Sequence, residues 1–333
     1  MTVVRLESAG VRQIFPGVPR GSWLQRRWHQ VAEWHRVPVG RKLARVLEDY
    51  QPDVVHTALV SGFGAIVWKV ARRYPLVHTI RDYYLVCART AAFRDGKACE
   101  SQCASCRFMR IETRRALRDA DLVAAVSGYI LQRHFDWDSL PGDMRTEVVY
   151  DRPVVAAPKR AAAGPASVVG CIGKLGEFKG TFVLLDAMAM IDDPDLRLVI
   201  AGPGEPDEVN RVLSAAAQDP RIRYAGVQDV VEFLESVDIV AAPAQLNEPF
   251  GRTPYEGALA GKHVIVSRRG GLPEVVQGYP NAHFVDESAD PAAWAEAIKR
   301  VIGTTPDTAT WIGHPDPVER YESLYREVIG ARG

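Results

Sequence analysis

Short apolar segments alternate along the chain with longer segments whose apolar residues recur every three or four positions. The first pattern predicts strands that are buried on both faces, and the second predicts amphipathic helices. Predicted strands of the first half begin at Pro52, Pro75, Asp121 and Glu147. Those of the second half begin at Val168, Leu196, Ile222, Asp238, His263 and His283. Regular strand–helix alternation is typical of parallel sheets covered by helices on both faces, so we expect an α/β fold.

Both ends of the chain carry helical patterns. The segment from Ser22 to Tyr50 predicts a helix interrupted at Pro38 and Gly40, because proline lacks the N–H that a helix interior needs. Its tryptophans lie among arginines and histidines, which fits a segment that touches a membrane or, as we favour, a helix packed on its own domain. The tail 317–329 predicts an amphipathic helix. Its apolar stripe is formed by Tyr321, Leu324, Tyr325 and Val328.

A region without periodicity divides the chain. Residues 154–167 are rich in alanine, proline and basic residues, which is typical of an interdomain linker. We therefore predict a first domain at residues 1–153, a linker at 154–166, a second domain at 167–313 and a C-terminal helix at 314–333. The 333 residues are enough for two domains of ordinary size.

The net charge is zero but unevenly spread. Residues 1–150 hold 23 basic and 15 acidic residues (23 − 15 = +8), and residues 151–333 hold 18 and 26 (18 − 26 = −8). The basic half indicates either an anionic partner, such as a membrane surface, or an ordinary solvated surface. A nucleic acid is not expected, since no binding motif accompanies the charge. No apolar run approaches the length of a membrane span, and the N-terminus lacks a signal peptide core, so we expect a cytoplasmic protein.

A glycine-rich loop follows the first predicted strand of the second half. It runs from Gly173 to Gly180 and carries Lys174 and Lys179. Backbone N–H groups of such a loop, together with two cations, are suited to holding a diphosphate.

A second candidate site follows the strand at Asp238. Glu248 lies before a predicted helix and Glu256 lies about one turn inside it, with Gly251 between them. The unpaired N–H groups of a helix start favour an anion, and glycine allows a ligand close to the backbone. Two carboxylates around an anion site indicate a ligand that has both hydroxyl groups and phosphates. The alternative is an ordinary turn with two solvated glutamates.

The run from Glu248 to Glu256, followed by the stretch from Gly270 to Val276, resembles the donor site of retaining family-four glycosyltransferases of the GT-B type. The resemblance implies two Rossmann-like domains facing across a cleft, with a C-terminal helix that crosses back to the first domain. It implies that Glu248 binds the donor sugar and stabilises an oxocarbenium-like transition state. It also implies that Glu256 binds the ribose hydroxyls. The residues expected to approach the sugar and phosphates through their backbone are Phe250, Gly251, Arg252 and Thr253.

The first half departs from this family in two places that concern the site. Nothing before Pro52 shows the usual opening strand and Gly-Gly loop, so that unit is either missing or divergent. Arg81 stands where the family has a histidine that faces the reacting sugar. Arginine cannot act as a base, so we assign Arg81 to the catalytic site as a stabiliser of phosphate charge. His78 is expected to be a core residue or to support the site from behind.

Four cysteines of the first half cluster in one segment: Cys87, Cys99, Cys103 and Cys106. Four thiols are suited to a tetrahedral structural zinc site, and an iron–sulfur cluster or free thiols are the alternatives. Disulfides are not expected in a reducing cytoplasm. Cys171 stands alone on a predicted strand of the second half.

The sequence therefore predicts a hexosyl-type transferase that uses a nucleoside diphosphate sugar as donor. The acceptor would be a glycan, a glycolipid or a small molecule, with polysaccharide assembly near the inner membrane face as the favoured context. Catalysis would be metal-independent, because Lys174, Lys179 and the helix start supply positive charge to the leaving diphosphate. Two alternatives stay open. One is a non-catalytic homologue that binds nucleotide-sugar and needs a partner, and the other is a nucleotide-sugar epimerase or hydrolase.

Overall fold

A computed structural model describes residues 37–153, 165–307 and 311–332. The chain divides into two compact units. The first unit contains residues 1–92, 99–150 and 316–333, and the second contains residues 93–98 and 151–315. The predicted linker lies largely outside the described residues. Most of the segment before Pro52, where the sequence lacks the usual opening strand and Gly-Gly loop, lies outside them too.

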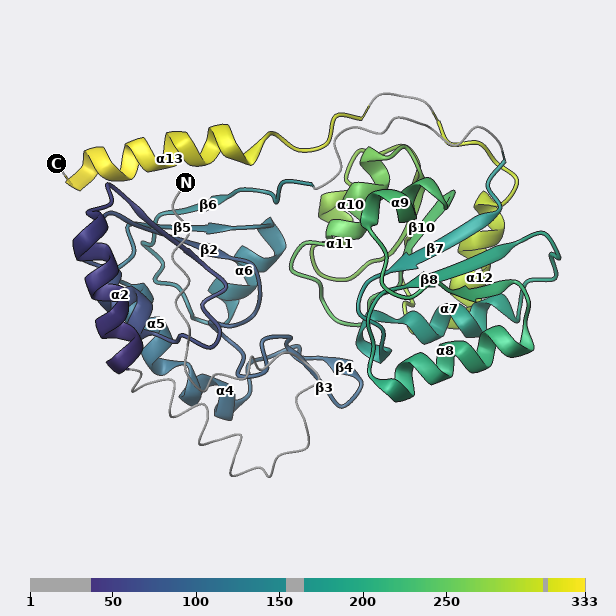
Figure 1. Cartoon of the computed structure of the whole chain (residues 1–333), viewed down its shortest axis with the longest axis horizontal. Coiled ribbons are helices and arrows are strands. Elements are labelled where there is room, and N and C mark those ends of the chain that lie inside the picture. The colour runs from purple at the N-terminus through teal and green to yellow at the C-terminus, as the bar shows by residue number, and fades with distance from the viewer. Residues whose placement is uncertain (1–36, 154–164, 308–310, 333) are drawn as a thin grey trace. The chain divides into compact units, whose positions relative to one another are not determined.

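The first unit is built on a four-stranded parallel sheet with strand order β1-β2-β5-β6 (Figure 1). Its strands are β1 (Val55–Ala58), β2 (Leu76–Ile80), β5 (Leu122–Ala125) and β6 (Thr146–Val148). Its helices are α2 (Val37–Tyr50), α3 (Ile66–Ala71), α4 (Ala104–Met109), α5 (Ile111–Leu117), α6 (Gly128–Asp136) and α13 (Pro317–Arg332). Strands β2 and β5 are buried along their whole length, as their apolar sequences predict.

The second unit is built on a six-stranded parallel sheet with strand order β12-β11-β10-β7-β8-β9. Its strands are β7 (Val168–Ile172), β8 (Arg197–Ala201), β9 (Ile222–Tyr224), β10 (Ile239–Ala242), β11 (His263–Ser267) and β12 (Ala282–Val285). Its helices are the short 3₁₀ helix η2 (Glu177–Lys179), α7 (Thr181–Met188), α8 (Pro206–Gln218), α9 (Val230–Glu235), α10 (Arg252–Leu259), α11 (Leu272–Val275) and α12 (Pro291–Val301). A small antiparallel hairpin, β3 (Phe93–Arg94) and β4 (Lys97–Ala98), completes the described strands.

Helices cover both faces of the second sheet. One apolar cluster joins alternate strand residues to α7, α8 and α12, around the fully buried Trp294. A second cluster on the other face includes Phe233 and Leu234 of α9. Figure 1 shows α7 and α8 on one side of β7 and β8, and α9 and α10 on the other. This doubly wound arrangement confirms the predicted α/β architecture of two Rossmann-like domains.

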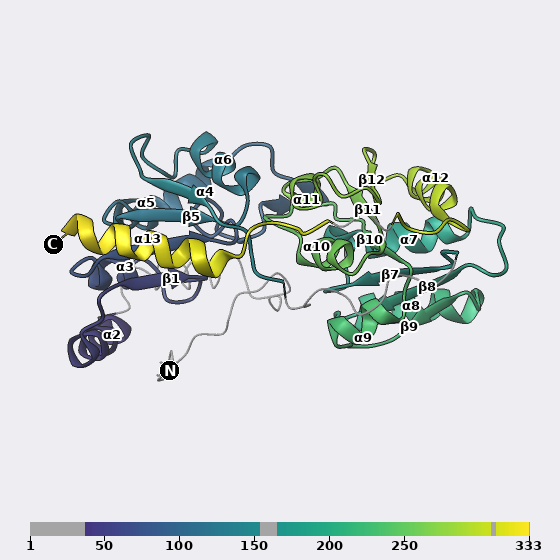
Figure 2. The same ribbon diagram turned by 90° about the horizontal axis from the view of Figure 1, so that it is seen from above.

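The C-terminal helix α13 packs on the first unit, although the segment before it belongs to the second. Leu324 and Val328 are buried against Val77 and Leu122 of the first sheet. Figures 1 and 2 both show α13 lying along this sheet. The predicted apolar stripe is therefore confirmed. A hydrogen bond between the Tyr321 hydroxyl and Thr79 Oγ1, 2.7 Å long, adds a polar contact to the same interface.

The Leu324→Ala variant is expected to lower the free energy of unfolding of the first unit by about 2–5 kcal/mol, because it opens a cavity in a closed apolar cluster. The matched control is Ile329→Ala on the same helix, since Ile329 is 37% exposed and Leu324 is 0% exposed. Urea denaturation followed by circular dichroism measures both. Equal loss in the two variants would contradict the packing of α13 on this sheet.

The predicted interruption at Gly40 is wrong, because α2 runs through this residue. Pro38 lies in the first described turn of α2, and the interruption expected there stays a prediction, since the residues before Val37 lie outside the described ones. Gly40 lets the helix approach α3 closely, since a Cβ there would lie 2.5 Å from Ile66 Cγ1. The helix is thus one continuous element over its described length. No helix among the described residues is long and apolar enough to cross a bilayer.

Candidate active site

The strand order of the second sheet places two loops side by side. Strands β7 and β10 are hydrogen-bonded neighbours, and the helices that follow them, α7 and α10, cover opposite faces of the sheet. Ligands of open α/β sheets bind at such a switch point, beyond the carboxyl ends of the strands. The glycine loop follows β7 here, and the Glu248 segment follows β10.

The glycine loop 173–180 is packed tightly against neighbouring strand ends. A Cβ at Gly180, where φ is +72°, would lie 1.8 Å from the Pro243 carbonyl oxygen beyond β10. A Cβ at Gly202, beyond β8, would lie 1.9 Å from the Gly173 carbonyl oxygen. The Phe178 carbonyl accepts a hydrogen bond of 2.9 Å from the N–H of Gln245. These contacts fix the loop beside the segment that carries Glu248.

The two predicted donor elements meet through an ion pair between Lys179 and Glu248. Both side chains are partly enclosed, with exposures of 34% and 14%. The predicted lysine and the predicted catalytic carboxylate therefore lie in one site. Lys174 has a different neighbour, because its Nζ lies 4.0 Å from Glu205 Oε1.

The Gly270–Gly271 pair holds the backbone of Glu248. The N–H of Gly271 donates to the Glu248 carbonyl over 2.7 Å. A Cβ at Gly270, where φ is +61°, would lie 2.3 Å from that carbonyl oxygen and 2.4 Å from the Glu248 nitrogen. The Gly270–Gly271 pair, which follows both glutamates in the sequence, thus fixes the backbone position of Glu248.

The Gly270→Ala variant is expected to disturb Glu248, whereas Gly303→Ala is a matched control. Both glycines have a positive φ, +61° and +73°, but only Gly270 has atoms within 4 Å of the added methyl group. Both variants therefore carry a backbone cost of about 1–2 kcal/mol. Gly270→Ala carries a further cost of about 1–3 kcal/mol for the steric clash. Thermal unfolding measures the difference, and an equal effect of the two variants would contradict the close contact.

Glu256 lies about one turn inside α10 and is 3% exposed. Its Oε1 accepts a hydrogen bond of 3.1 Å from Arg252 Nη2, one turn earlier. Gly251 precedes this helix with φ of +107°, and Thr253 Oγ1 donates to the carbonyl of Ile172 at the end of β7 over 3.4 Å. The start of α10 is thus tied to the strand that leads into the glycine loop.

The Phe250 side chain is buried and contacts Tyr255 edge-on, with ring centroids 5.5 Å apart. It therefore anchors the loop in the core, and only its backbone is available to a ligand. Tyr255 is held in turn by its hydroxyl, which accepts a hydrogen bond of 3.0 Å from the His314 N–H. Sequence reasoning did not single out Tyr255 or His314, whose roles depend on contacts distant in the chain.

The arrangement combines two enclosed carboxylates with two cations and the N-terminus of an eight-residue helix. Carboxylates accept hydrogen bonds from hydroxyl groups, and the cations and helix start favour an anion. The site is therefore chemically suited to a ligand that carries both hydroxyls and phosphates.

Two residues considered in the sequence analysis, His78 and Arg81, belong to the first unit. His78 is buried, its Nδ1 lies 2.9 Å from Thr57 Oγ1, and burial lowers its pKa to about 3. His78 is thus a neutral core residue, one of the two roles expected for it. Arg81 follows the carboxyl end of β2, and its catalytic role stays a prediction.

The sulfurs of the cysteine segment have polar neighbours. Cys103 Sγ lies 3.3 Å from Ser105 Oγ, and the N–H of Ala88 points to Cys106 Sγ over 3.5 Å. The neighbouring Cys106 thiol lowers the pKa of Cys87 to about 6, and Cys87 in turn raises the pKa of Cys106. Within the described part of the chain, no group of three or more histidine, cysteine or carboxylate side chains is placed to hold a metal ion. A structural zinc on these cysteines and Cys99 stays a prediction.

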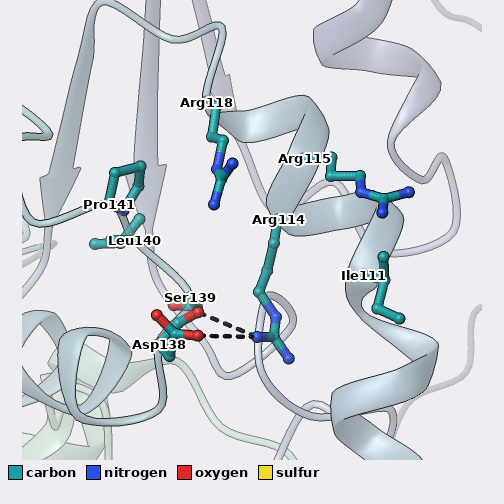
Figure 3. Close-up of a pocket in the computed structure, with 8 residues that line it drawn as sticks. All are labelled: Ile111, Arg114, Arg115, Arg118, Asp138, Ser139, Leu140 and Pro141. Carbon is teal, nitrogen blue, oxygen red and sulfur yellow. Dashed lines mark hydrogen bonds and ion pairs between the residues drawn. The ribbon is translucent and has the colours of Figure 1, made fainter.

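A cavity of about 290 Å³ in the first unit has a basic lining that the sequence motifs did not indicate. It lies between α5 and residues 138–141. Figure 3 shows Arg114 reaching toward Asp138, and Arg118 pointing into the space beside Leu140. Arg114 Nη1 donates to the Asp138 carbonyl over 3.1 Å. The high arginine content of the segment that forms α5 was the sequence signal that could have indicated this basic lining.

Comparisons with known proteins cover both halves of the chain. Residues 166–304 match the family "Glycosyl transferases group 1", and residues 3–149 match the "Glycosyl transferase 4-like domain". An uncharacterized 42.6 kDa protein in the cps region of Klebsiella pneumoniae is 26% identical over 273 residues, which cover 79% of this chain and 69% of that protein. The D-inositol 3-phosphate glycosyltransferase of Corynebacterium glutamicum is 28% identical, with 75% and 64% covered. The chain thus spans about two thirds of the length of these relatives.

Solved structures share the fold. The Anabaena protein HepE, in complex with UDP and glucose, has a TM-score of 0.64 at 21% identity, with 87% of this chain and 81% of that chain covered. Sucrose-phosphate synthase from Thermosynechococcus elongatus has a TM-score of 0.58 at 21% identity, with 88% and 74% covered. Both halves of the chain are matched, in sequence by the two family descriptions and in fold by these structures. The chain therefore belongs to the group 1 glycosyltransferases, has a family 4-like first domain and adopts the GT-B fold.

Proposed function

We propose that this chain transfers a hexosyl group from a nucleoside diphosphate sugar to an acceptor with retention of anomeric configuration. The observation that carries the proposal is the ion pair between Lys179 and Glu248, together with the enclosed Glu256 in the helix α10 that follows. It joins groups suited to diphosphate, sugar and ribose in one site. The binding of UDP and glucose by the similarly folded Anabaena protein supports a donor of this class.

Each side chain has a separate part in the proposed mechanism. Glu248 binds sugar hydroxyls and stabilises the positive charge that develops on the sugar, and Glu256 accepts hydrogen bonds from the ribose. Lys174, Lys179 and the N–H groups of α10 stabilise the departing diphosphate, which makes a divalent metal unnecessary for that step. The acceptor hydroxyl attacks from the face that the diphosphate leaves, and a diphosphate oxygen takes its proton. We propose that Arg81 stabilises phosphate charge, the role assigned to it from the sequence.

The transfer is tested by incubating the chain with donor sugars and short glycan, glycolipid or polyol phosphate acceptors, with EDTA present in one series. Proton NMR of the product measures the anomeric coupling constant. The proposal predicts the same anomeric configuration in donor and product, and equal rates with and without EDTA. An inverted product would overturn the retaining mechanism, and loss of activity in EDTA would overturn metal independence.

We propose a phosphorylated or lipid-linked acceptor in polysaccharide assembly. The relative encoded in a cps region and the relative named for inositol 3-phosphate support this acceptor class. The basic cavity of Figure 3 gives the first unit a place for an anionic group, because Arg118 lines it and makes no ion pair with any described residue. The same surface would contact the anionic inner face of a membrane.

Membrane contact is tested by co-sedimentation with vesicles of phosphatidylglycerol and phosphatidylcholine, against vesicles of phosphatidylcholine alone. Binding only to the anionic vesicles, reduced in Arg118→Gln, is the expected result. The matched control is Arg211→Gln on α8 of the second unit, which should bind as the unchanged chain does. Equal binding to both kinds of vesicle, or to neither, would contradict the proposed contact.

A further inference from the structure

The cavity between α5 and residues 138–141 has walls of two kinds. Arg114 and Arg118 form a cationic wall, and Leu140 and Pro141 form an apolar one. Figure 3 shows Arg118 extending into the space between Pro141 and Arg114. The volume of about 290 Å³ is near the lower end of the range for ligand pockets. A small anion with an organic substituent would contact both walls.

Hydrogen bonds hold the Arg114 guanidinium in a fixed position. Its Nη1 donates to the Asp138 carbonyl over 3.1 Å. Its Nη2 donates to Gln102 Oε1 over 3.3 Å and to the Arg107 carbonyl over 3.2 Å. The Arg114 Nε is buried and has no hydrogen-bond partner in the part of the chain that the structure describes. A buried donor without an acceptor costs free energy, so a ligand oxygen in the cavity that Arg114 lines would stabilise this side chain.

Arg118 differs from its neighbours because it lacks a carboxylate partner. Arg115 is paired with Glu112 at 3.4 Å, and Arg72 is paired with Asp119 at 3.5 Å. The Arg118 side chain makes no ion pair or hydrogen bond with any residue in the described ranges. Its guanidinium therefore keeps its N–H donors for a ligand or for water.

The cavity has a surplus of positive charge. Asp138 is the acidic residue of its described lining, 3.8 Å from Arg114 Nη1, and the Asp138 side chain is 99% exposed. A carboxylate in contact with water offsets a nearby charge only weakly. Arg114 and Arg118 thus present about two positive charges to the cavity, which matches a phosphate monoester of about −1.5 to −2 at neutral pH. Guanidinium groups also fit phosphate oxygens through paired N–H donors.

We propose that this cavity binds the phosphate group of a phosphate monoester. Arg118 contacts the phosphate directly, Arg114 supplies a second fixed charge, and the organic substituent packs on Leu140 and Pro141. The group has two sources, a soluble phosphate ester and a lipid with a terminal phosphate. The inference builds on the anionic contact proposed above for this cavity. It is independent of glycosyl transfer, because the cavity belongs to the first unit and the donor residues belong to the second.

The test is calorimetric titration of the full chain with glycerol 3-phosphate, without a donor sugar. Saturable binding is expected, and Arg118→Gln should weaken it by about 10–100-fold, because hydrogen bonds to a charged group are removed. The matched control is Arg73→Gln, since Arg73 is in the same unit, is 78% exposed and does not line the cavity. This control should bind within about twofold of the unchanged chain. Arg114 is left unchanged because its hydrogen bonds also hold the surrounding backbone.

Lys179→Ala separates the cavity from the donor site as the place where phosphate binds. This variant should keep the full affinity for glycerol 3-phosphate. Binding that is lost in Lys179→Ala and kept in Arg118→Gln would place the phosphate at the donor site and overturn the proposal. Equal weakening in Arg118→Gln and Arg73→Gln would also overturn it, as would the absence of binding by the folded chain. Circular dichroism of each variant establishes that it is folded.

Co-sedimentation with vesicles of phosphatidic acid and phosphatidylcholine distinguishes the two sources. Binding to these vesicles that glycerol 3-phosphate displaces would identify a lipid phosphate as the ligand. Binding of glycerol 3-phosphate without binding to the vesicles would identify a soluble ester. Vesicle binding that Arg118→Gln leaves unchanged, and that glycerol 3-phosphate does not displace, would contradict a phosphate site in the cavity.

Discussion

Glu248→Gln is expected to lower the turnover rate by about 100–1000-fold, while the donor still binds. The amide keeps the shape of the side chain but removes the negative charge that stabilises the developing positive charge on the sugar. In the structure, Glu248 is paired with Lys179. Removing its charge frees Lys179 for the diphosphate, so the dissociation constant of the donor should stay unchanged or fall. Steady-state kinetics and calorimetry with the same donor separate the two effects.

The matched control for Glu248→Gln is Glu296→Gln on α12, where Glu296 is exposed and paired with Lys299 at 3.0 Å. This control should leave both turnover and donor affinity within twofold of the unchanged chain, about the level expected of a surface change. A Glu248→Gln variant whose turnover rate is close to that of the unsubstituted chain would contradict the catalytic role of Glu248. A variant that instead loses donor binding would make Glu248 a binding residue only.

Glu256→Ala is expected to raise the donor dissociation constant by about 10–100-fold, with a smaller change in turnover at saturating donor. Hydrogen bonds to a charged group contribute about 1.5–3 kcal/mol, and the ribose hydroxyls would lose theirs. Glu256 is nearly fully enclosed at 3% exposure, so water replaces it poorly. Its partner Arg252 is 49% exposed and is not left buried without a partner. Calorimetric titration with the donor and with the free nucleoside diphosphate measures the change.

A comparison of the diphosphate nucleotide with inorganic pyrophosphate sharpens this test. Loss of ribose contacts should weaken the nucleotide and leave pyrophosphate binding nearly unchanged, because pyrophosphate has no ribose. Equal weakening of both ligands would indicate that Glu256→Ala damages the anion site as a whole. In that case its role would be to position Arg252 and the start of α10.

The strand–helix alternation and the apolar stripe of α13 could be predicted because local periodicity determines them. The site elements were predictable for a related reason, since Lys179 and Glu248 each lie in a short motif with a distinctive spacing. Their contact was not predictable from either motif alone. It depends on β7 and β10 being neighbours in the sheet, which is a non-local pairing.

The continuity of α2 through Gly40 was missed because the reason is tertiary. Gly40 accommodates Ile66 of α3, a residue distant in the chain, and propensity alone counts glycine against a helix. Likewise, the close contact between Gly270 and the Glu248 backbone could not be predicted, because it depends on how two separate segments pack together. Positive φ at glycine can be suspected from sequence, but the atom that a methyl group would strike cannot.

Calorimetric titration of the chain with UDP-, GDP-, ADP- and dTDP-sugars, with Lys179→Ala in parallel, tests the proposed donor site most directly. We expect saturable binding of one nucleotide class. We also expect Lys179→Ala to lose affinity by at least about tenfold, because a charged contact to the diphosphate is removed. Equal affinity of both proteins for a donor would place the diphosphate elsewhere. Binding of no donor by the folded chain would contradict the donor site between the glycine loop and α10.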